Sequence, residues 1–220
     1  MHSIFHKLET VDLEGMDEIK ACKIFKKGET VFAENGHPLG LYCINHGKIK
    51  LSVAGINGKE QIIRLLKEGD VVGYRALLSE DRYHCSAIAL EDCSVCFIPK
   101  SSFFTMIQQS PTVNAELLRL LSKNLKHAEE QVVTMAQKNV RERMAEALLF
   151  FKASYGVNEK DGNLNIHFSR EEIANFVGTS TETAIRLLSE FQQDGIIEVK
   201  AKKIRIAQVA KLTQTANLDD

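Results

Sequence analysis

Two helix starts on either side of one glycine, within residues 169–195, constrain the fold of this chain most. Ser169 is followed three residues later by Glu172, a capping box that predicts a first helix over 170–177. Gly178 ends this helix, because glycine is unfavourable in a helix interior. The chain must therefore turn within a few residues before it enters the next helix.

The second helix is predicted over 180–193, with Thr179 or Ser180 as its N-cap and Gly195 after its end. Its apolar residues recur at helical spacing, at Ala184, Leu187, Leu188 and Phe191. Two short helices joined by a tight turn with glycine form a helix-turn-helix, whose second helix can enter the major groove of DNA. A small helical hairpin without any DNA function would show the same pattern, so the pattern alone leaves both interpretations open.

Polar and basic side chains favour the DNA interpretation. After the second helix, residues 196–209 are typical of a strand, a basic turn and another strand, which together make the wing of a winged helix. The predicted DNA contacts are Ser169, Arg170, Ser180, Thr181, Glu182, Thr183, Arg186, Lys200, Lys202 and Lys203. Arg186 is expected to donate to guanine and Glu182 to accept from cytosine, while the lysines suit phosphates.

The run EIANFVGTSTETAIRLLSEFQQDGII resembles the DNA-binding motif of the Crp/Fnr superfamily of bacterial transcription regulators. The E-T-x-x-R run of that motif is matched by Glu182, Thr183 and Arg186. The resemblance implies an α+β fold with an N-terminal antiparallel β-roll of jelly-roll type, a long dimerisation helix and a C-terminal winged helix-turn-helix. It also implies a sequence-specific DNA-binding regulator whose partners are a palindromic operator, a second copy of the chain and RNA polymerase.

Residues 22–99 agree with such a roll. Turn signals recur every eight to twelve residues and separate short apolar runs, which predicts an antiparallel sandwich or barrel. Further along, residues 111–137 form an uninterrupted helical pattern with a narrow apolar seam, which is typical of a two-stranded coiled coil and predicts a homodimer. The seam consists of Leu118, Leu121, Leu125, Ala128, Val132 and Met135.

Three segments are expected. They are a sensing domain over 1–110 that begins with a short helical region, a dimerisation helix over 111–138 and a winged helix-turn-helix domain over 139–220. Asn139 with Glu142 can cap a new helix after a break, and residues 164–168 alternate as a short strand.

Charge does not by itself favour DNA, because the chain carries a formal net charge of −1 and residues 138–220 hold twelve basic and twelve acidic residues. Any positive field must come from the placement of charges. The balanced charge keeps a second hypothesis open, a ligand-sensing or interaction protein of the same fold with little DNA affinity. No nucleophile–base pair, phosphate loop or metal constellation indicates an enzyme.

The resemblance also indicates an effector pocket. Members that respond to cAMP hold the ribose with a glycine-acidic pair and the cyclic phosphate with a later Arg-Ser/Thr. In this sequence Tyr74 replaces the acidic residue and Cys85 replaces the arginine. A phosphate without a guanidinium loses a bidentate contact, so we expect an effector other than cAMP, which the sequence does not identify.

The predicted effector pocket consists of Gly73, Tyr74, Arg75, Arg82, Cys85 and Ser86. Arg75 and Arg82 could hold a different anion, or they could be solvated loop residues. Ala128 and Glu129 replace the hydroxyl pair that contacts adenine from the long helix, which also argues against cAMP.

Five cysteines, all within the first hundred residues, favour reduced thiols in a cytoplasmic protein over a disulfide framework. Cys93 and Cys96 lie three apart in a predicted strand and point to opposite faces, so we expect buried thiols and no shared metal. The cysteine and histidine spacings do not favour an iron–sulfur cluster or haem. No signal peptide and no apolar run long enough for a membrane span is visible.

Overall fold

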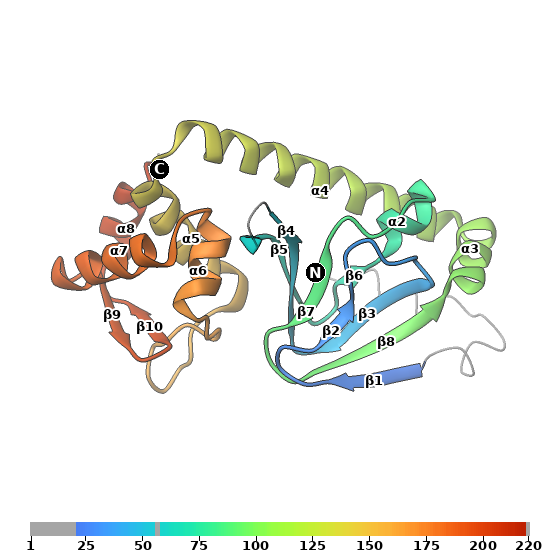
Figure 1. Cartoon of the computed structure of the whole chain (residues 1–220), viewed down its shortest axis with the longest axis horizontal. Coiled ribbons are helices and arrows are strands. Elements are labelled where there is room, and N and C mark those ends of the chain that lie inside the picture. Colours follow the sequence, from blue (N-terminus) through green and yellow to red (C-terminus); the bar gives the residue numbers. More distant parts are fainter. Residues whose placement is uncertain (1–20, 56–57, 219–220) are drawn as a thin grey trace. The chain divides into compact units, whose positions relative to one another are not determined.

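The computed structural model describes residues 21–55 and 58–218 (Figure 1). The chain divides into two compact units, residues 1–126 and residues 127–220. Most of the helical region expected before residue 22 lies outside the described residues. No helix among the described residues combines the length and the apolar character that a membrane crossing needs.

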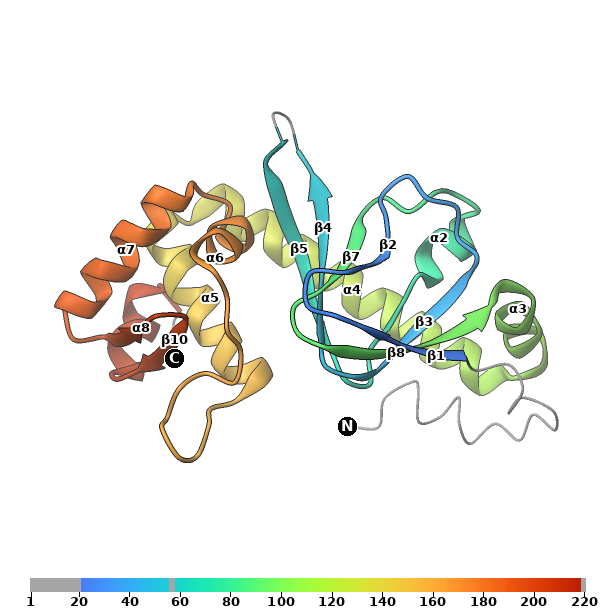
Figure 2. The same ribbon diagram turned by 60° about the horizontal axis from the view of Figure 1, so that its bottom comes forward.

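The first unit is a β-roll made of two antiparallel four-stranded sheets (Figures 1 and 2). One sheet has the order β1 (Ala21–Phe25), β8 (Cys93–Pro99), β3 (Gly40–His46), β6 (Val71–Val72). The other has the order β2 (Thr30–Phe32), β7 (Ser86–Ala89), β4 (Lys48–Ala54), β5 (Glu60–Lys67). The fold class expected from the sequence is therefore correct.

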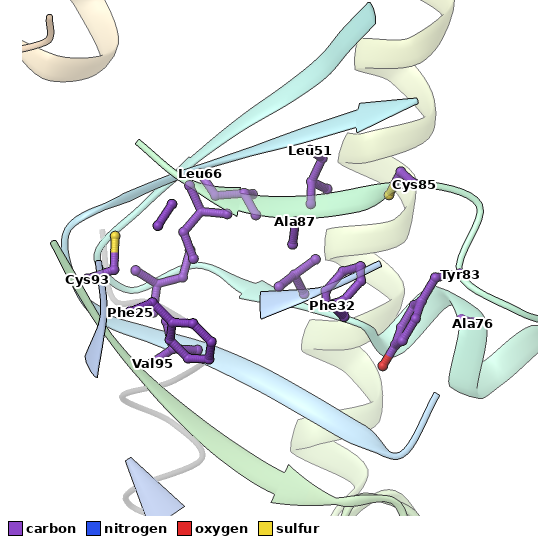
Figure 3. Close-up of a cluster of buried hydrophobic side chains, with 14 residues drawn as sticks. Phe25, Phe32, Leu51, Leu66, Ala76, Tyr83, Cys85, Ala87, Cys93 and Val95 are labelled. Atoms are coloured by element: carbon purple, nitrogen blue, oxygen red, sulfur yellow. The ribbon is translucent and has the colours of Figure 1, made fainter. Parts of the chain in front are cut away.

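Strand β8 is buried on both faces, and its alternating side chains join two hydrophobic clusters. Cys93 and Val95 belong to the cluster between the sheets, where Phe32 and Tyr83 stack with ring centroids 4.0 Å apart (Figure 3). Cys96 and Ile98 face the opposite way. They pack with residues of helices α2 (Tyr74–Ser79), α3 (Lys100–Gln109) and α4 (Pro111–Gln137).

The expectation that all five cysteines are reduced thiols was wrong for one pair. Cys22 and Cys96 form a disulfide, because β1 pairs with β8 in the register that places these two residues opposite each other, with Cα atoms 3.9 Å apart. Cys43 faces Cys96 from β3 on the other side. Cys93 is buried as expected, and its thiol lies in the cluster between the sheets, away from Cys96.

The second unit contains α5 (Val140–Tyr155), α6 (Arg170–Val177), α7 (Thr181–Gln193) and α8 (Val209–Thr215), with a two-stranded sheet of β9 (Ile197–Lys200) and β10 (Lys203–Ile206). Asn139 caps α5 in the expected capping box with Glu142. The strand expected over 164–168 is absent there: Leu164 takes part in one isolated bridge with Val157. Leu164, Ile166 and Phe168 are buried, so their alternation reflected burial of one face and not a paired strand.

Candidate nucleic-acid interface and sensor pocket

Helix α6 begins and ends as its sequence predicts. The Ser169 hydroxyl accepts a hydrogen bond from the Glu172 amide at 3.1 Å, and the Glu172 carboxylate accepts one from the Ser169 amide at 2.6 Å. Gly178 follows the helix with φ 74° and donates its amide to the Ala174 carbonyl. This left-handed stop is strained for other residues, and it lets the chain start α7 almost at once.

The sequence allowed either Thr179 or Ser180 as the N-cap of helix α7. The cap is Ser180, whose hydroxyl accepts from the Thr183 amide at 3.2 Å. Ala184, Leu187, Leu188 and Phe191 are buried. These four side chains thus form the inward face of α7.

The outward face of α7 carries Glu182, Ile185, Arg186 and Ser189, all exposed. The pKa of Glu182 is lowered by its own backbone amide and by the Ser180 side chain, so it stays an acceptor at neutral pH. Arg186 donates to Glu190 at 2.5 Å. Thr181 and Thr183 are half-buried beside this face.

The wing is the hairpin of β9 and β10. Its turn contains Ala201 with φ 55° and the exposed Lys202, while Lys200 is exposed at the end of β9 and Lys203 at the start of β10. Arg170 donates to the Ala201 carbonyl at 3.0 Å, which links the start of α6 to the wing turn. The predicted contacts of the helix-turn-helix and of the wing are therefore brought together within one unit.

Arg143 of α5 connects the turn of the helix-turn-helix to the end of α4. Its Nε donates to the Val177 carbonyl at 3.0 Å, one terminal nitrogen donates to Lys138 at 2.8 Å, and the other donates to Gly178 at 3.2 Å. Three backbone carbonyls at two helix ends thus share one guanidinium. Because carbonyls at helix C-termini lack intrahelical donors, this cation stabilises both ends.

The predicted pocket residues make separate hydrogen bonds in the first unit, although Arg75 is close enough to Cys85 to oppose, in part, the effect of burial on the pKa of its thiol. Arg82 donates to the Asn35 carbonyl at 3.0 Å, and Arg75 lies 3.3 Å from the imidazole of His84. The Ser86 hydroxyl accepts from the Glu34 amide at 2.9 Å. The two arginines therefore have different partners in this structure, Asn35 for Arg82 and His84 for Arg75.

Tyr74 occupies a central position in this region. It is 2% exposed and follows Gly73, whose φ of 97° suits glycine and whose added Cβ would lie 2.9 Å from the Gly40 carbonyl oxygen. The Tyr74 hydroxyl accepts hydrogen bonds from Asn124 of α4 and, at 3.4 Å, from Arg64 of β5. The phenol thus ties α2 to β5 and α4 within the first unit.

The residues present do not fit a cyclic nucleotide. Cys85 is 3% exposed in the cluster between the sheets, and burial raises the pKa of its thiol to about 11. A neutral thiol cannot replace the guanidinium that a cyclic phosphate needs. Figure 3 shows Cys85 among the side chains of this cluster. A buried phenol likewise cannot accept the two hydroxyls of a ribose as a carboxylate does.

The cysteines do not fit an iron–sulfur cluster either. Such a cluster needs about four thiolates on one site, whereas Cys22 and Cys96 are bonded to each other and Cys85 and Cys93 lie in the cluster between the sheets. Within residues 21–55 and 58–218, no three His, Cys, Asp or Glu side chains are grouped to hold a metal ion.

Helix α4 exposes most of its predicted seam. Leu118, Leu125 and Val132 are 65%, 62% and 69% exposed, and Met135 and Ala128 are exposed too. Leu121 is half-buried and packs against the cluster that α4 shares with the first unit.

Sequence reasoning missed Arg64, Asn124, Arg143 and Glu190. Arg64 had a visible signal, since it is a charged residue inside the apolar run EQIIRLL. Asn124 had none, because its partner Tyr74 is remote in sequence, and Arg143 had none, because its partners are main-chain carbonyls. Glu190 was detectable as an i,i+4 partner of Arg186.

Two family models match the chain. Residues 22–110 match a cyclic nucleotide-binding domain, and residues 142–215 match a Crp-like helix-turn-helix domain. The structure of FixK2 from Bradyrhizobium japonicum has a TM-score of 0.80, covers 92% of this chain and 100% of that chain, and is 24% identical. That likeness concerns the fold.

Curated relatives extend the match over nearly the whole chain. Transcriptional activator protein anr of Pseudomonas aeruginosa is 30% identical over 212 residues, which are 95% of this chain and 86% of the relative. The fumarate and nitrate reduction regulatory protein of Escherichia coli K12 is 32% identical over 215 residues, 96% of this chain and 83% of the relative. The chain therefore belongs to the Crp/Fnr family of DNA-binding transcription regulators, which function as dimers and are not enzymes.

Proposed function

We propose that this regulator reads DNA with the outward face of α7. Arg186 donates to guanine O6 and N7, and Glu182 accepts from cytosine N4, which are the contacts that these side chains make best in a major groove. The observation that carries this proposal is the composition of the face: an exposed arginine and an ionised glutamate lie one turn apart on the side of α7 opposite its core.

The backbone contacts fall to residues around this face. Lys200, Lys202 and Lys203 are exposed on the wing and suit phosphates, and Arg170 lies beside them through its bond to Ala201. Ser169, Ser180, Thr181 and Thr183 add hydroxyl groups near the starts of α6 and α7, where backbone amides favour an anion.

Two chains associate, in this proposal, through the exposed seam of α4, namely Leu118, Leu125, Ala128, Val132 and Met135, with Leu121 at its margin. A seam of this kind is costly to leave in water, and a second copy covers it with an identical stripe. The two-fold axis then gives a palindromic operator with half-sites about 34 Å apart.

The sensor half takes an unidentified small molecule and not cAMP. Support comes from the match to a cyclic nucleotide-binding domain together with the changes at Tyr74 and Cys85. We place the regulator in the cytoplasm with DNA and RNA polymerase, as a transcription regulator requires.

Selection of operators from random-sequence DNA at low salt, followed by fluorescence anisotropy, tests the proposal. Wild type is expected to enrich a palindrome that contains a G·C pair in each half-site. Arg186→Ala should lose about 1–3 kcal/mol of specific binding and flatten the preference at that pair. An Arg186→Ala variant that discriminates as well as wild type would remove α7 as the reading helix. Absence of DNA retention at any salt would favour a ligand-sensing protein without DNA affinity.

A further inference from the structure

Helix α7 carries one large apolar side chain that its core does not use. Leu187, Leu188 and Phe191 are 4%, 2% and 0% exposed, whereas Ile185 is 47% exposed. Isoleucine has a lower helix propensity than alanine or leucine because its branched side chain is restricted at χ1. About half of the Ile185 side chain is therefore available for contact with a bound partner.

The neighbours of Ile185 define what its surface can contact. Glu182 lies one turn before it and Arg186 directly after it, both exposed. Ser189, one turn later, donates its hydroxyl to the Ile185 carbonyl at 3.0 Å, so that donor is engaged with the helix backbone. The face thus offers an acceptor and a cation with an apolar side chain beside them, and the hydroxyl of Ser189 at the next turn is already engaged.

In the major groove, the C5 methyl group of thymine is the apolar feature among hydrogen-bonding base edges. An isoleucine packs favourably against that methyl group. Against guanine, adenine or cytosine edges it would cover donors or acceptors without giving them a partner, which is unfavourable. The residue therefore selects for thymine both by attraction and by exclusion of other bases.

We infer that Ile185 is a specificity-determining residue that reads the methyl group of a thymine in the base pair adjacent to the G·C pair contacted by Arg186 and Glu182. This inference rests on the proposed reading of DNA by α7. Burial of one methyl group corresponds to about fourfold in affinity per half-site, and so to about 15-fold when both half-sites of a palindrome are changed.

The test removes only the methyl group. Deoxyuridine replaces the thymine at the adjacent position in both half-sites of the selected operator, and dissociation constants are measured by fluorescence anisotropy at fixed salt. Wild type should bind the deoxyuridine operator about 15-fold more weakly. Ile185→Ser should bind both operators equally, and Ile185→Val, which keeps a branched apolar surface, should retain most of the difference. Because Ile185 is exposed, circular dichroism should show both variants folded.

The outcomes separate this inference from the reading of DNA by α7. An operator that depends on Arg186 but is bound equally with thymine and deoxyuridine overturns the inference alone. So does a selected operator with no base preference at the adjacent position, or an Ile185→Ser variant that keeps the thymine preference. If no operator is enriched, or if operator binding does not depend on Arg186, the proposed reading of DNA by α7 is wrong, and so is the inference about Ile185.

Discussion

Arg186 and Glu190 form an ion pair across one turn of α7, with nitrogen and oxygen 2.5 Å apart. The other carboxylate oxygen of Glu190 receives Arg141 of α5 at 2.7 Å, and Arg141 also pairs with Asp194 at 2.8 Å. The guanidinium proposed to read guanine is therefore held by a carboxylate that is itself fixed by a second helix. Because this support already restricts the Arg186 side chain, the side chain loses less conformational entropy when it binds a base.

Replacing Glu190 with alanine is expected to weaken discrimination without weakening total DNA affinity. The substitution removes the carboxylate that holds Arg186, and it also removes one negative charge near the phosphates of the bound DNA. Exposed ion pairs contribute up to about 1 kcal/mol, so the ratio of specific to non-specific affinity should fall by about two- to fivefold. Anisotropy titrations with the selected operator and with random-sequence DNA measure both affinities.

Glu159→Ala is the matched control, because it makes the same charge change in an exposed loop of the same unit. It should leave the specificity ratio unchanged. Equal falls of the ratio in both variants would show that charge and not the support of Arg186 is responsible.

Lysines of the wing should contribute affinity without sequence preference. Lys202→Ala is expected to weaken binding to all sequences alike and to reduce the slope of log affinity against log salt by about 0.9. Lys203 pairs with Asp161 at 3.3 Å, so Lys203→Ala should reduce that slope less. Titrations at several salt concentrations measure both slopes, and a loss confined to the operator would contradict a phosphate contact.

The helix-turn-helix was predictable because its signals are local. Ser169 and Glu172 lie within one turn, and Gly178 supplies the left-handed stop that ends α6. The disulfide was not predictable, because Cys22 and Cys96 are 74 residues apart and meet only through the register of β1 on β8. Cys93 and Cys96 do lie on opposite faces of β8, and the partner of Cys96 comes from another strand, β1.

The sensor half shows the same division between local and remote information. The turn glycines and alternating runs predicted the roll, since each strand is encoded over a few residues. The side chains that face Tyr74 come from β5 and α4, which are brought together only by tertiary packing. The sequence therefore indicated that Tyr74 replaces the acidic residue of the cAMP-responsive members. Its partners, Arg64 and Asn124, are seen only in the structure.

Tyr74→Phe should destabilise the first unit, because it removes the hydroxyl that accepts from Asn124 and Arg64 while keeping the ring. A buried group that loses its partner costs about 1–3 kcal/mol in the free energy of unfolding. Adding Asn124→Leu should recover part of this loss, since replacing both partners with apolar groups is nearly neutral. Urea unfolding of the two single variants and the double variant gives the coupling energy, and a value of zero would exclude the contact.

Reduction of the Cys22–Cys96 disulfide should lower stability markedly. The bond joins residues separated by 74 positions, and closure of such a loop in the unfolded chain corresponds to about 4 kcal/mol. Dithiothreitol should shift the urea midpoint of wild type but not that of Cys22→Ser. A wild-type midpoint that does not respond to reductant would contradict the contribution of this bond.

Asp70 and Asp92 should respond to pH in opposite directions. Burial raises the pKa of Asp70 above 3.8, although the Lys67 amide, Arg64 and Lys67 oppose the change. Its ionised form is therefore disfavoured in the folded state, and this destabilises the protein above the folded pKa. Asp70→Asn keeps an acceptor for the Lys67 amide, which donates at 2.9 Å, so this variant should be more stable than wild type at pH 7.

The pKa of Asp92 is shifted in the opposite direction to that of Asp70. Its hydrogen bond with Lys26 and that with the Lys27 amide lower its pKa below 3.8, so its ionised form stabilises the folded state above that pH. Asp92→Asn should be less stable than wild type at pH 7, and this difference in stability should disappear only as the pH falls below about 3.8. The stability gained by Asp70→Asn should already decrease as the pH approaches 3.8 from above. Urea unfolding of the three proteins from pH 7 to pH 3 measures both differences. Differences of the same sign would mean that burial does not dominate at Asp70.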